Sequence, residues 1–342
     1  MIKRILYLGY YIKQMDWKKF WLFLNYTAQH SNKNKVSILM DAVACVFIYN
    51  ISILEYFQFR FFEKNKEQRK DWAGTGYMFE YQLIMNPKKD RLILDDKTLF
   101  YKEYQPYFVH TVADIADLKK NTTVVEKLLN TKSGKLVFKV ADGKCGVAVE
   151  IKKANEFNEA SLISFMENNK FDLVEEFIIQ HPSLNALSPT AVNTVRIFTQ
   201  LNKNNEVEIL GCRQRISVNS SVDNMAAGNL AAPIDEQTGI VSGVAVYSDI
   251  TKPEESKHPI TGIAIVGFEV PFWKETMVMV KEAALLHPQN RSIGWDVVIT
   301  ESGPGFIEGN HDWCKLLWQL PVKKGMKSVL EAYKNDYVSY FF

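Results

Sequence analysis

Residues 294–313, GWDVVITESGPGFIEGNHDW, place three oxygen-bearing side chains inside two apolar runs: Asp296 in the first, Glu308 and Asn310 in the second. If the runs are strands joined by the loop ESGPG, Asp296 faces Asn310 and Val298 faces Glu308. Side chains alternate along a strand, so the three polar groups then share one face. Two carboxylates and an amide oxygen predict a Mg²⁺ site, because Mg²⁺ takes one or two carboxylates and keeps positions for water and phosphate. The alternative is an exposed hairpin face with unrelated polar residues.

A second candidate is the stretch KLVFKVADGKCGVAVEI, residues 135–151, which has the pattern of strand, loop and strand. Lys139 lies in the first strand. The loop residues of interest are Asp142, Gly143, Lys144 and Gly146. Glycines let backbone N–H groups approach phosphate oxygens, and lysine supplies positive charge. The stretch lacks the GK[ST] sequence and the following helix of a Walker loop, and a plain hairpin with a surface lysine fits the pattern equally well.

Charged residues also enter two further apolar segments. LVEEFIIQH, residues 173–181, is either a partly exposed edge strand or a linker between two lobes whose backbone groups recognise a base. NTVRIFTQL, residues 193–201, places Arg196 among apolar strand residues. A buried arginine needs an anionic partner, and a phosphate would serve.

The elements that must position these residues form an α+β mixture. Residues 1 to about 72 have helical patterns, whereas residues 73–95 read as irregular around the turn signal MNPKK. Beyond them, helices are predicted for DKTLFYKEYQ, EASLISFMENN and KETMVMVKEAALLH, and hairpins around NKNNE and in 294–313. Antiparallel hairpins exclude the alternating units of a doubly wound sheet. We therefore divide the chain into a helical N-terminal region (1–95), a small lobe (96–180) and a large lobe (181–342).

Composition places the chain among ordinary globular proteins. It has 342 residues, is 47% hydrophobic and 23% charged, and carries a net charge of +2, which argues against disorder and against a nucleic-acid partner. The four cysteines form no CxxC pair, which argues against a zinc site or a disulfide framework. A cytoplasmic location is the expectation from this cysteine usage.

Two apolar segments raise the question of a membrane. MIKRILYLGYYIKQMDWKKFWLFL is interrupted by charged residues and lacks a cleavage site, so it predicts an amphipathic helix and not an export signal. DAVACVFIYNISILEYFQFRFF contains Asn50, Glu55, Gln58 and Arg60, which favours a buried helical pair over a membrane span. Membrane contact is then at most peripheral, through the aromatic, lysine-rich N-terminal segment.

Taken in order, these pieces resemble the ATP-grasp superfamily. Asp296 followed by Glu308 and Asn310 is similar to its Asp…Glu-x-Asn magnesium motif. EEFIIQHPSLNALSPTAVNTVRIFT, VDNMAAGNLA and GWDVVITESGPGFIEGN resemble more narrowly the sugar-transfer-associated ATP-grasp family. The resemblance covers roughly residues 50–325. It implies an ATP-grasp fold, in which two α+β lobes grip ATP, preceded by a helical N-terminal region. The chain departs from the pattern in DGKCG and AAGNLA, where glycine pairs are common.

The resemblance also implies a role for each matching residue. Lys97, in the DDK sequence at 95–97, and Lys139 would contact the phosphates of ATP, together with the glycine-containing loop. The adenine would be recognised by a segment made of Glu175, Glu176, Phe177 and Ile178. The downstream acidic residue that often holds the ribose is absent, which leaves His181 or Asn185 as the candidate. Mg²⁺ would be held by Asp296, Glu308 and Asn310. Arg196 would lie near the transferred phosphate, and Arg213 and Arg215 would bind the carboxylate substrate or phosphate.

The activity implied by the resemblance is that of a carboxylate–amine ligase. ATP would phosphorylate a carboxylate, and an amine would attack the acyl phosphate, giving an amide, ADP and phosphate. The substrates would be small molecules linked to saccharides, for example an amino acid and a uronic acid, in the synthesis or modification of cell-surface polysaccharide. Two alternatives remain: a phosphotransferase acting on a sugar hydroxyl, and a nucleotide-binding assembly factor of a glycan-synthesis complex.

Overall fold

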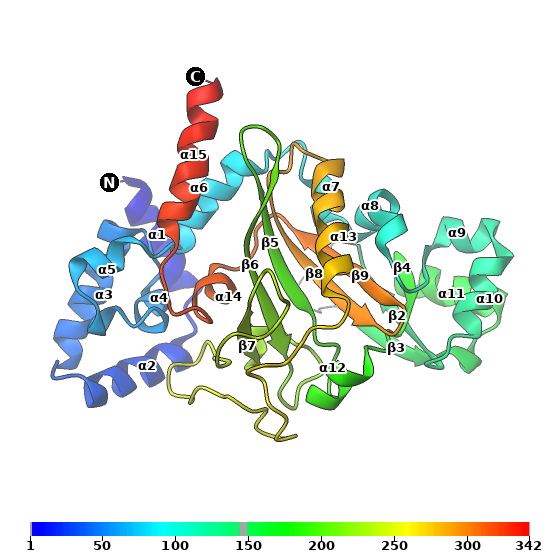
Figure 1. The fold of residues 1–342 in the computed structure, drawn as a ribbon, viewed down its shortest axis with the longest axis horizontal. Helices are drawn as coiled ribbons and strands as arrows, with labels where there is room; N and C mark the ends of the chain where they lie inside the picture. Colours follow the sequence, from blue (N-terminus) through cyan, green and yellow to red (C-terminus); the bar gives the residue numbers. More distant parts are fainter. Residues whose placement is uncertain (1, 142, 144–148, 342) are drawn as a thin grey trace.

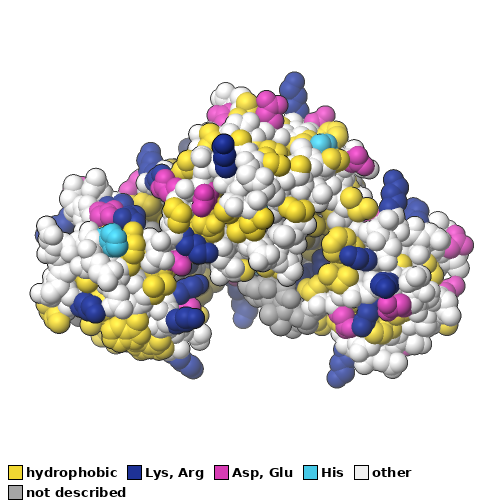
Figure 2. Space-filling model, turned by 90° about the horizontal axis from the view of Figure 1, so that it is seen from below, with side chains coloured by type: hydrophobic (Ala, Val, Ile, Leu, Met, Phe, Trp, Pro, Cys, Tyr) yellow, Lys and Arg dark blue, Asp and Glu magenta, His cyan; other side chains and the backbone are white. Residues whose placement is uncertain are grey.

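The computed structural model describes residues 2–141, 143 and 149–341. Two antiparallel sheets and a helical region make up the molecule, with the larger sheet in the centre (Figure 1). The N-terminal helices and the smaller sheet with its helices project on either side of the larger sheet (Figure 2). No helix in the described ranges has the length and apolar character needed to cross a membrane.

The helical region begins with two helices where the sequence pattern indicated one. Asp16 accepts a hydrogen bond from the backbone N–H of Lys19 and so begins a new helix. Asn34, Ser52 and Asn65 are N-caps in the same way. The helices are α1 (Ile2–Lys13), α2 (Trp17–His30), α3 (Lys35–Tyr49), α4 (Ile53–Gln58) and α5 (Lys66–Lys70). The expected buried pair corresponds to α3 and α4, which share a core of aromatic and aliphatic side chains, but α3 is buried on one side only.

Residues 73–95 are not irregular, contrary to the expectation from sequence. They contain α6 (Thr75–Met85) and α7 (Leu92–Asp95). The start of α6 is held by a distant residue, because the Glu55 carboxylate accepts hydrogen bonds from the backbone N–H of Thr75 at 2.9 Å and from its hydroxyl at 2.7 Å. A local pattern could not reveal that contact.

The smaller sheet has the strand order β1-β4-β2-β3. Its strands are β1 (Val112–Asp114), β2 (Lys135–Lys139), β3 (Val149–Lys153) and β4 (Leu173–Glu176). Leu136, Phe138 and Val174 point into a core that α9 (Ile115–Lys120), α10 (Thr122–Leu129) and α11 (Glu159–Asn169) complete (Figure 1). Helix α8 (Lys97–Tyr104) precedes this unit. The strands predicted within residues 135–151 and 173–181 are therefore present, as β2, β3 and β4.

The larger sheet has the strand order β7-β6-β5-β8-β9. Its strands are β5 (Val195–Leu201), β6 (Val207–Ile216), β7 (Leu230–Ile234), β8 (Ser292–Thr300) and β9 (Gly303–Asn310). Both predicted hairpins are present, β5–β6 and β8–β9.

The two faces of this sheet bury different cores. Val195 and Ile197 join the core formed with α13 (Trp273–Leu286) and α12 (Pro182–Leu187), whereas Phe198 joins the core of the N-terminal helices. Since side chains alternate along β5, Arg196 lies on the same face as Phe198. Helices α14 (Lys315–Gln319) and α15 (Lys327–Phe341) end the chain on that side (Figure 1).

The register of the last hairpin differs from the predicted one. Gly303 pairs with Thr300, so the glycines of GPG continue strand β9 and the turn shortens to residues 301–302. A bulge beside Asp296 then leaves one residue of β9 unpaired, and Asp296 lies directly opposite Glu308, not Asn310. Because the shortened turn and the bulge compensate, the three polar side chains still share one face.

Candidate functional site

A cavity of about 360 Å³ lies at the face of the larger sheet that carries Arg196. Seven of the residues singled out from the sequence line it: Lys97, Gly143, Arg196, Arg215, Asp296, Glu308 and Asn310. They come from α8, the loop after β2, and strands β5, β6, β8 and β9. Segments that are up to 213 positions apart in the sequence, from Lys97 to Asn310, therefore meet in one place.

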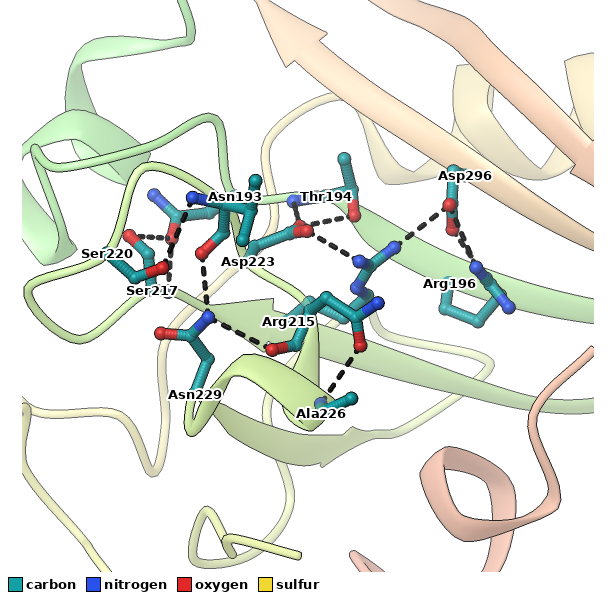
Figure 3. Close-up of polar contacts among 12 residues, drawn as sticks. Asn193, Thr194, Arg196, Arg215, Ser217, Ser220, Asp223, Ala226, Asn229 and Asp296 are labelled. Atoms are coloured by element: carbon teal, nitrogen blue, oxygen red, sulfur yellow. Dashed lines mark hydrogen bonds and ion pairs between the residues drawn. The ribbon is translucent and has the colours of Figure 1, made fainter. Parts of the chain in front are cut away.

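Asp296 is the centre of a buried ion-pair network (Figure 3). Arg196 donates to it from Nε at 2.5 Å and from Nη2 at 2.8 Å, and Arg215 donates from Nη1 at 2.9 Å. Burial acts to raise the pKa of the Asp296 carboxyl, but the charges of both guanidinium groups outweigh it and hold that pKa below its usual range. Asp296 is thus ionised, and the anionic partner that Arg196 requires is a residue of the chain itself.

Arg215 is fixed by a second carboxylate that the sequence did not reveal. Its Nη2 lies 2.6 Å from Oδ1 of Asp223. Asp223 in turn accepts hydrogen bonds from the backbone N–H of Thr194 at 2.8 Å and from the hydroxyl at 2.5 Å (Figure 3). Asp223 lies in an irregular segment between β6 and β7, within the stretch VDNMAAGNLA, but no role was predicted for it. The network leaves both arginines with little freedom to move.

Glu308 and Asn310 flank Asp296 at the cavity. Nδ2 of Asn310 donates to Oε1 of Glu308 at 3.2 Å. Burial, and after it the negative charge of Asp296, raise the pKa of the Glu308 carboxyl. The two arginines compensate the charge of Asp296 but not that of Glu308. A further positive charge beside Glu308 would therefore be stabilised.

These residues fit a magnesium ion. Their donors are carboxylate and amide oxygens, and a cation beside Glu308 would relieve the repulsion that raises its pKa. Within the described part of the chain, no three Asp, Glu, His or Cys side chains lie close enough together to hold a metal ion by themselves. A site with two carboxylates and one amide is instead open, which suits a cation that keeps water and phosphate ligands.

Lys97 joins helix α8 to the start of the glycine-containing loop. Its ammonium group donates to the carbonyl of Gly143 and, at 3.5 Å, to that of Ala141. Its backbone N–H also donates to Ala141, at 3.1 Å. Lys97 and Gly143 both line the cavity. Asp142, Lys144 and Gly146, the other loop residues of the prediction, lie outside the described residues.

Lys139 takes part in a buried cluster away from this cavity. Its ammonium group is ion-paired with Glu175, and Nε2 of His110 lies 3.3 Å from the other oxygen of that carboxylate. Burial acts to raise the pKa of Glu175, but Lys139 and His110 outweigh it and lower this pKa to about 2. His110 was not singled out from the sequence, where it follows no recognisable pattern.

The segment from Glu176 to His181 connects the two sheets. Glu176 accepts a hydrogen bond from the backbone N–H of Thr111 at 3.0 Å, and Phe177 donates its backbone N–H to Lys135. His181 donates its backbone N–H to Ile299 of the larger sheet at 2.8 Å and is the N-cap of α12. Glu176 and Ile178 line a second groove, of about 540 Å³, beside the turn of the β8–β9 hairpin. The segment thus forms a bridge between the lobes, as a hinge requires.

Arg213 lies apart from the other two arginines. Its guanidinium group donates to the carbonyl of Trp318 in α14, at 3.1 and 2.5 Å, and to that of Cys212 at 2.7 Å. Burial lowers its pKa to about 10. Arg213 does not line the cavity, and its contacts attach α14 to the sheet.

Four further residues that line the cavity were given no role from the sequence. They are Lys19 of α2, Gln58 of α4, and Asn224 and Ser248 from irregular segments. Gln58 donates from Nε2 to the carbonyl of Ser248 at 3.3 Å. Among the described residues, the Lys19 ammonium group has no acidic partner. The helical N-terminal region therefore forms one wall of the cavity.

Comparison with known proteins gives one family. The family model described as sugar-transfer associated ATP-grasp matches residues 78–335. The sequence has no match among curated proteins.

Several solved structures are similar at low sequence identity. An L-amino acid ligase from Bacillus licheniformis is 13% identical, with 71% of this chain and 48% of that chain covered and a TM-score of 0.40. D-alanyl-alanine synthetase A from Vibrio cholerae is 12% identical, with 72% and 66% covered and a TM-score of 0.40. A D-cycloserine synthetase is 10% identical, with 73% of each chain covered and a TM-score of 0.42. The chain spans about half the length of the first structures that it matches.

Proposed function

Since the chain belongs to the sugar-transfer-associated ATP-grasp family, we propose that it is an ATP-dependent carboxylate–amine ligase that forms an acyl phosphate. The family match covers most of the chain, and the α+β ATP-grasp fold predicted from the sequence is confirmed. An ATP-grasp enzyme associated with sugar transfer has small-molecule substrates. Their identity, the amide product and the role of each residue are parts of the proposal.

The observation that carries the proposal is the lining of the cavity. Besides the oxygen ligands Asp296, Glu308 and Asn310, it includes Lys19 and Gln58 from the N-terminal helices. An ATPase without a second substrate would not need these two side chains. A cationic group beside hydrogen-bonding side chains suits a carboxylate with hydroxyl groups, such as a uronic acid.

In the proposed reaction, an oxygen of the substrate carboxylate attacks the γ-phosphorus of ATP. The bond between that phosphorus and the bridging oxygen breaks, and ADP leaves. The amine nitrogen then attacks the acyl carbon, the bond from carbon to the phosphate oxygen breaks, and phosphate leaves while the amine loses a proton to solvent. No side chain acts as a nucleophile, so the protein positions the reactants and stabilises charge.

The residues divide these tasks according to their placement. Asp296, Glu308 and Asn310 would hold Mg²⁺, which supplies neutralisation of phosphate charge when bound. Lys97 and the backbone near Gly143 would bind phosphate oxygens. Arg215, fixed by two carboxylates, presents positive charge to the developing charge on the transferred group without having to reorganise.

Lys139 and the hinge would form the adenine end of the site. The ion pair between Lys139 and Glu175 would exchange for contacts with nucleotide when the lobes close, and backbone groups around Glu176 to Ile178 would recognise the base. We place the reaction in the cytoplasm, since ATP is made there and the described cysteines, Cys45, Cys212 and Cys314, are free thiols.

The experiment is ATP turnover measured against a panel of uronic acids and amino acids. A ligase releases ADP and phosphate only when carboxylate and amine are both present. ADP formation with a sugar alone, without phosphate release, would instead identify a phosphotransferase. A chain that binds ATP and turns it over with no member of a broad panel would favour the assembly factor.

Variants connect this turnover with the structure. Lys19→Ala should raise KM for the carboxylate about tenfold or more and leave KM for ATP unchanged, because the proposal assigns Lys19 to the carboxylate and not to the nucleotide. Lys18→Ala is the matched control, since Lys18 is the neighbouring exposed lysine of α2 and does not line the cavity. Equal effects of the two substitutions would refute this placement of the carboxylate.

A further inference from the structure

The N-terminal helices expose an unusual amount of apolar surface. On α1, Ile2, Ile5 and Leu6 are all more than half exposed. Their spacing of three and four residues places them on one face of the helix, opposite the buried Tyr11. Single exposed apolar residues are ordinary, but a face made of them requires an explanation.

Helix α2 presents aromatic side chains in the same way. Trp17 and Trp21 are four residues apart and about half exposed, at 50% and 54%. Both rings contact the buried Phe20, with centroids 5.6 and 5.1 Å apart, and so are held at the surface. Leu22 is exposed beside them.

Helix α3 is apolar on both its faces. Ile38, Ala42, Cys45 and Val46 are buried against the other helices. Its outer face carries the exposed Val36, Leu39, Met40, Phe47 and Ile48. An amphipathic helix of a water-soluble protein has a polar outer face, and a helix that is apolar all round is normally covered. The outer face of α3 is not covered by any described residue that would bury these side chains.

Charge indicates what covers this surface. Residues 1–49, which hold these three helices, contain seven Lys or Arg and two Asp, a net charge of +5, whereas the whole chain carries +2, so that the remaining residues carry −3. A second copy of the same surface would meet it with like charge. An anionic lipid surface would match both the charge and the tryptophans, which favour the boundary between headgroups and acyl chains.

We propose that the outer faces of α1, α2 and α3 form a membrane-docking surface that lies in the headgroup region of an anionic lipid bilayer. Figure 2 shows apolar side chains gathered on the N-terminal lobe with Lys and Arg side chains around them. Helix α3 has 15 residues and extends about 22 Å, shorter than the roughly 30 Å hydrocarbon core, so it would lie along the surface. Because α2 also contributes Lys19 to the cavity, docking would hold the cavity close to the bilayer.

The test is sedimentation of the full chain with vesicles. The vesicles are phosphatidylcholine alone, or phosphatidylcholine with about 30% phosphatidylglycerol, a proportion of anionic lipid chosen for a strong electrostatic attraction. We expect sedimentation with the anionic vesicles, much less with the neutral ones, and release at high salt. Lys18→Glu should lower the bound fraction at least about fivefold, because it replaces attraction with repulsion.

Two further variants distinguish docking through α3 from nonspecific adsorption through any exposed apolar side chain. Val36→Ser with Met40→Ser removes apolar side chains from α3 and should lower anionic-vesicle binding about tenfold or more. Val278→Ser with Leu285→Ser removes similarly exposed side chains from α13 and should bind like wild type. Both should match wild type in melting temperature and ATP turnover.

Three results would overturn the proposal. They are no sedimentation with either vesicle, equal loss of binding in the α3 and α13 variants, and equal binding to neutral and anionic vesicles. A concentration-dependent dimer in light scattering that the α3 variant abolishes would assign the surface to a second copy of the chain instead.

Discussion

Two substitutions at the cavity should distinguish a charge that stabilises the fold, that of Asp296, from a charge that mainly serves the reaction, that of Glu308. Asp296→Asn removes the only described acidic partner of Arg196, a residue that is 6% exposed. Breaking a buried ion pair from one side costs about 3–5 kcal/mol, because a charge is left unpaired. We expect about 3 kcal/mol, since the amide oxygen of asparagine still accepts one hydrogen bond and Arg215 keeps Asp223.

The size of the shift in melting temperature follows from chain length. Unfolding entropy of about 2.1 cal/mol/K per residue gives roughly 0.7 kcal/mol/K for 342 residues. A loss of 3 kcal/mol then lowers the melting temperature by about 4 °C. Scanning calorimetry of Asp296→Asn and wild type at pH 7 measures it.

Glu308→Gln should behave in the opposite way. Burial and Asp296 raise the pKa of Glu308, so ionising this carboxyl in the folded protein costs stability, and a neutral amide removes that cost. The melting temperature should stay the same or rise, while ATP turnover should fall about a hundredfold or more. Glu282→Gln, on the exposed face of α13, is the control and should change neither. A Glu308→Gln protein that loses as much stability as Asp296→Asn, or that keeps wild-type turnover, would refute the reasoning.

Three further outcomes are expected. The low pKa of Glu175 contributes stability of order 3 kcal/mol above about pH 4.5, and this contribution is lost as the pH falls toward 2. In urea unfolding, the difference in free energy of unfolding between wild type and Glu175→Gln should therefore shrink from pH 5 to pH 3. A difference that stays constant over this range would contradict the reasoning. Arg213→Met should lower the free energy of unfolding by about 1–3 kcal/mol, because its hydrogen bonds to two carbonyl groups are lost, while KM for ATP stays unchanged. A large rise in KM for ATP would instead show that Arg213 takes part in substrate binding. Gly294→Ala should cost about 1–3 kcal/mol, because its Cβ would lie 2.6 Å from that of Trp313. Gly9→Ala meets open space inside helix α1 and should raise stability slightly, by about 0.5–1 kcal/mol, in thermal melts.

Local patterns were sufficient to predict the hairpins and the shared face. In the β8–β9 hairpin, alternation and apolar runs placed Asp296, Glu308 and Asn310 on one side, as the structure has them. The register was wrong because GPG reads as a turn, whereas Gly303 has φ +118° and lets the strand continue. A bulge is decided by contacts across the sheet, and no local pattern indicates it.

The parts of the candidate site that were missed depend on contacts between distant residues. The sequence predicted that Arg196 needs an anion, but not that the anion is Asp296, 100 positions away. No role was predicted for Asp223 or Lys19, although Asp223 lies in the stretch VDNMAAGNLA, and only the folded chain brings Asp223 to Arg215 and Lys19 to the cavity. Helix α6 was missed for the same reason, since Glu55 holds its first residue.

The central claim is that Asp296, Glu308 and Asn310 bind a magnesium–nucleotide complex in the cavity. Its most direct test is calorimetric titration of wild type and Glu308→Gln with a non-hydrolysable ATP analogue, with and without Mg²⁺. We predict that Mg²⁺ tightens analogue binding to wild type at least about tenfold, and that Glu308→Gln loses this gain while binding the metal-free analogue normally, because it removes a charged ligand of the cation. An equal gain from Mg²⁺ in both proteins, or none in wild type, would contradict the claim.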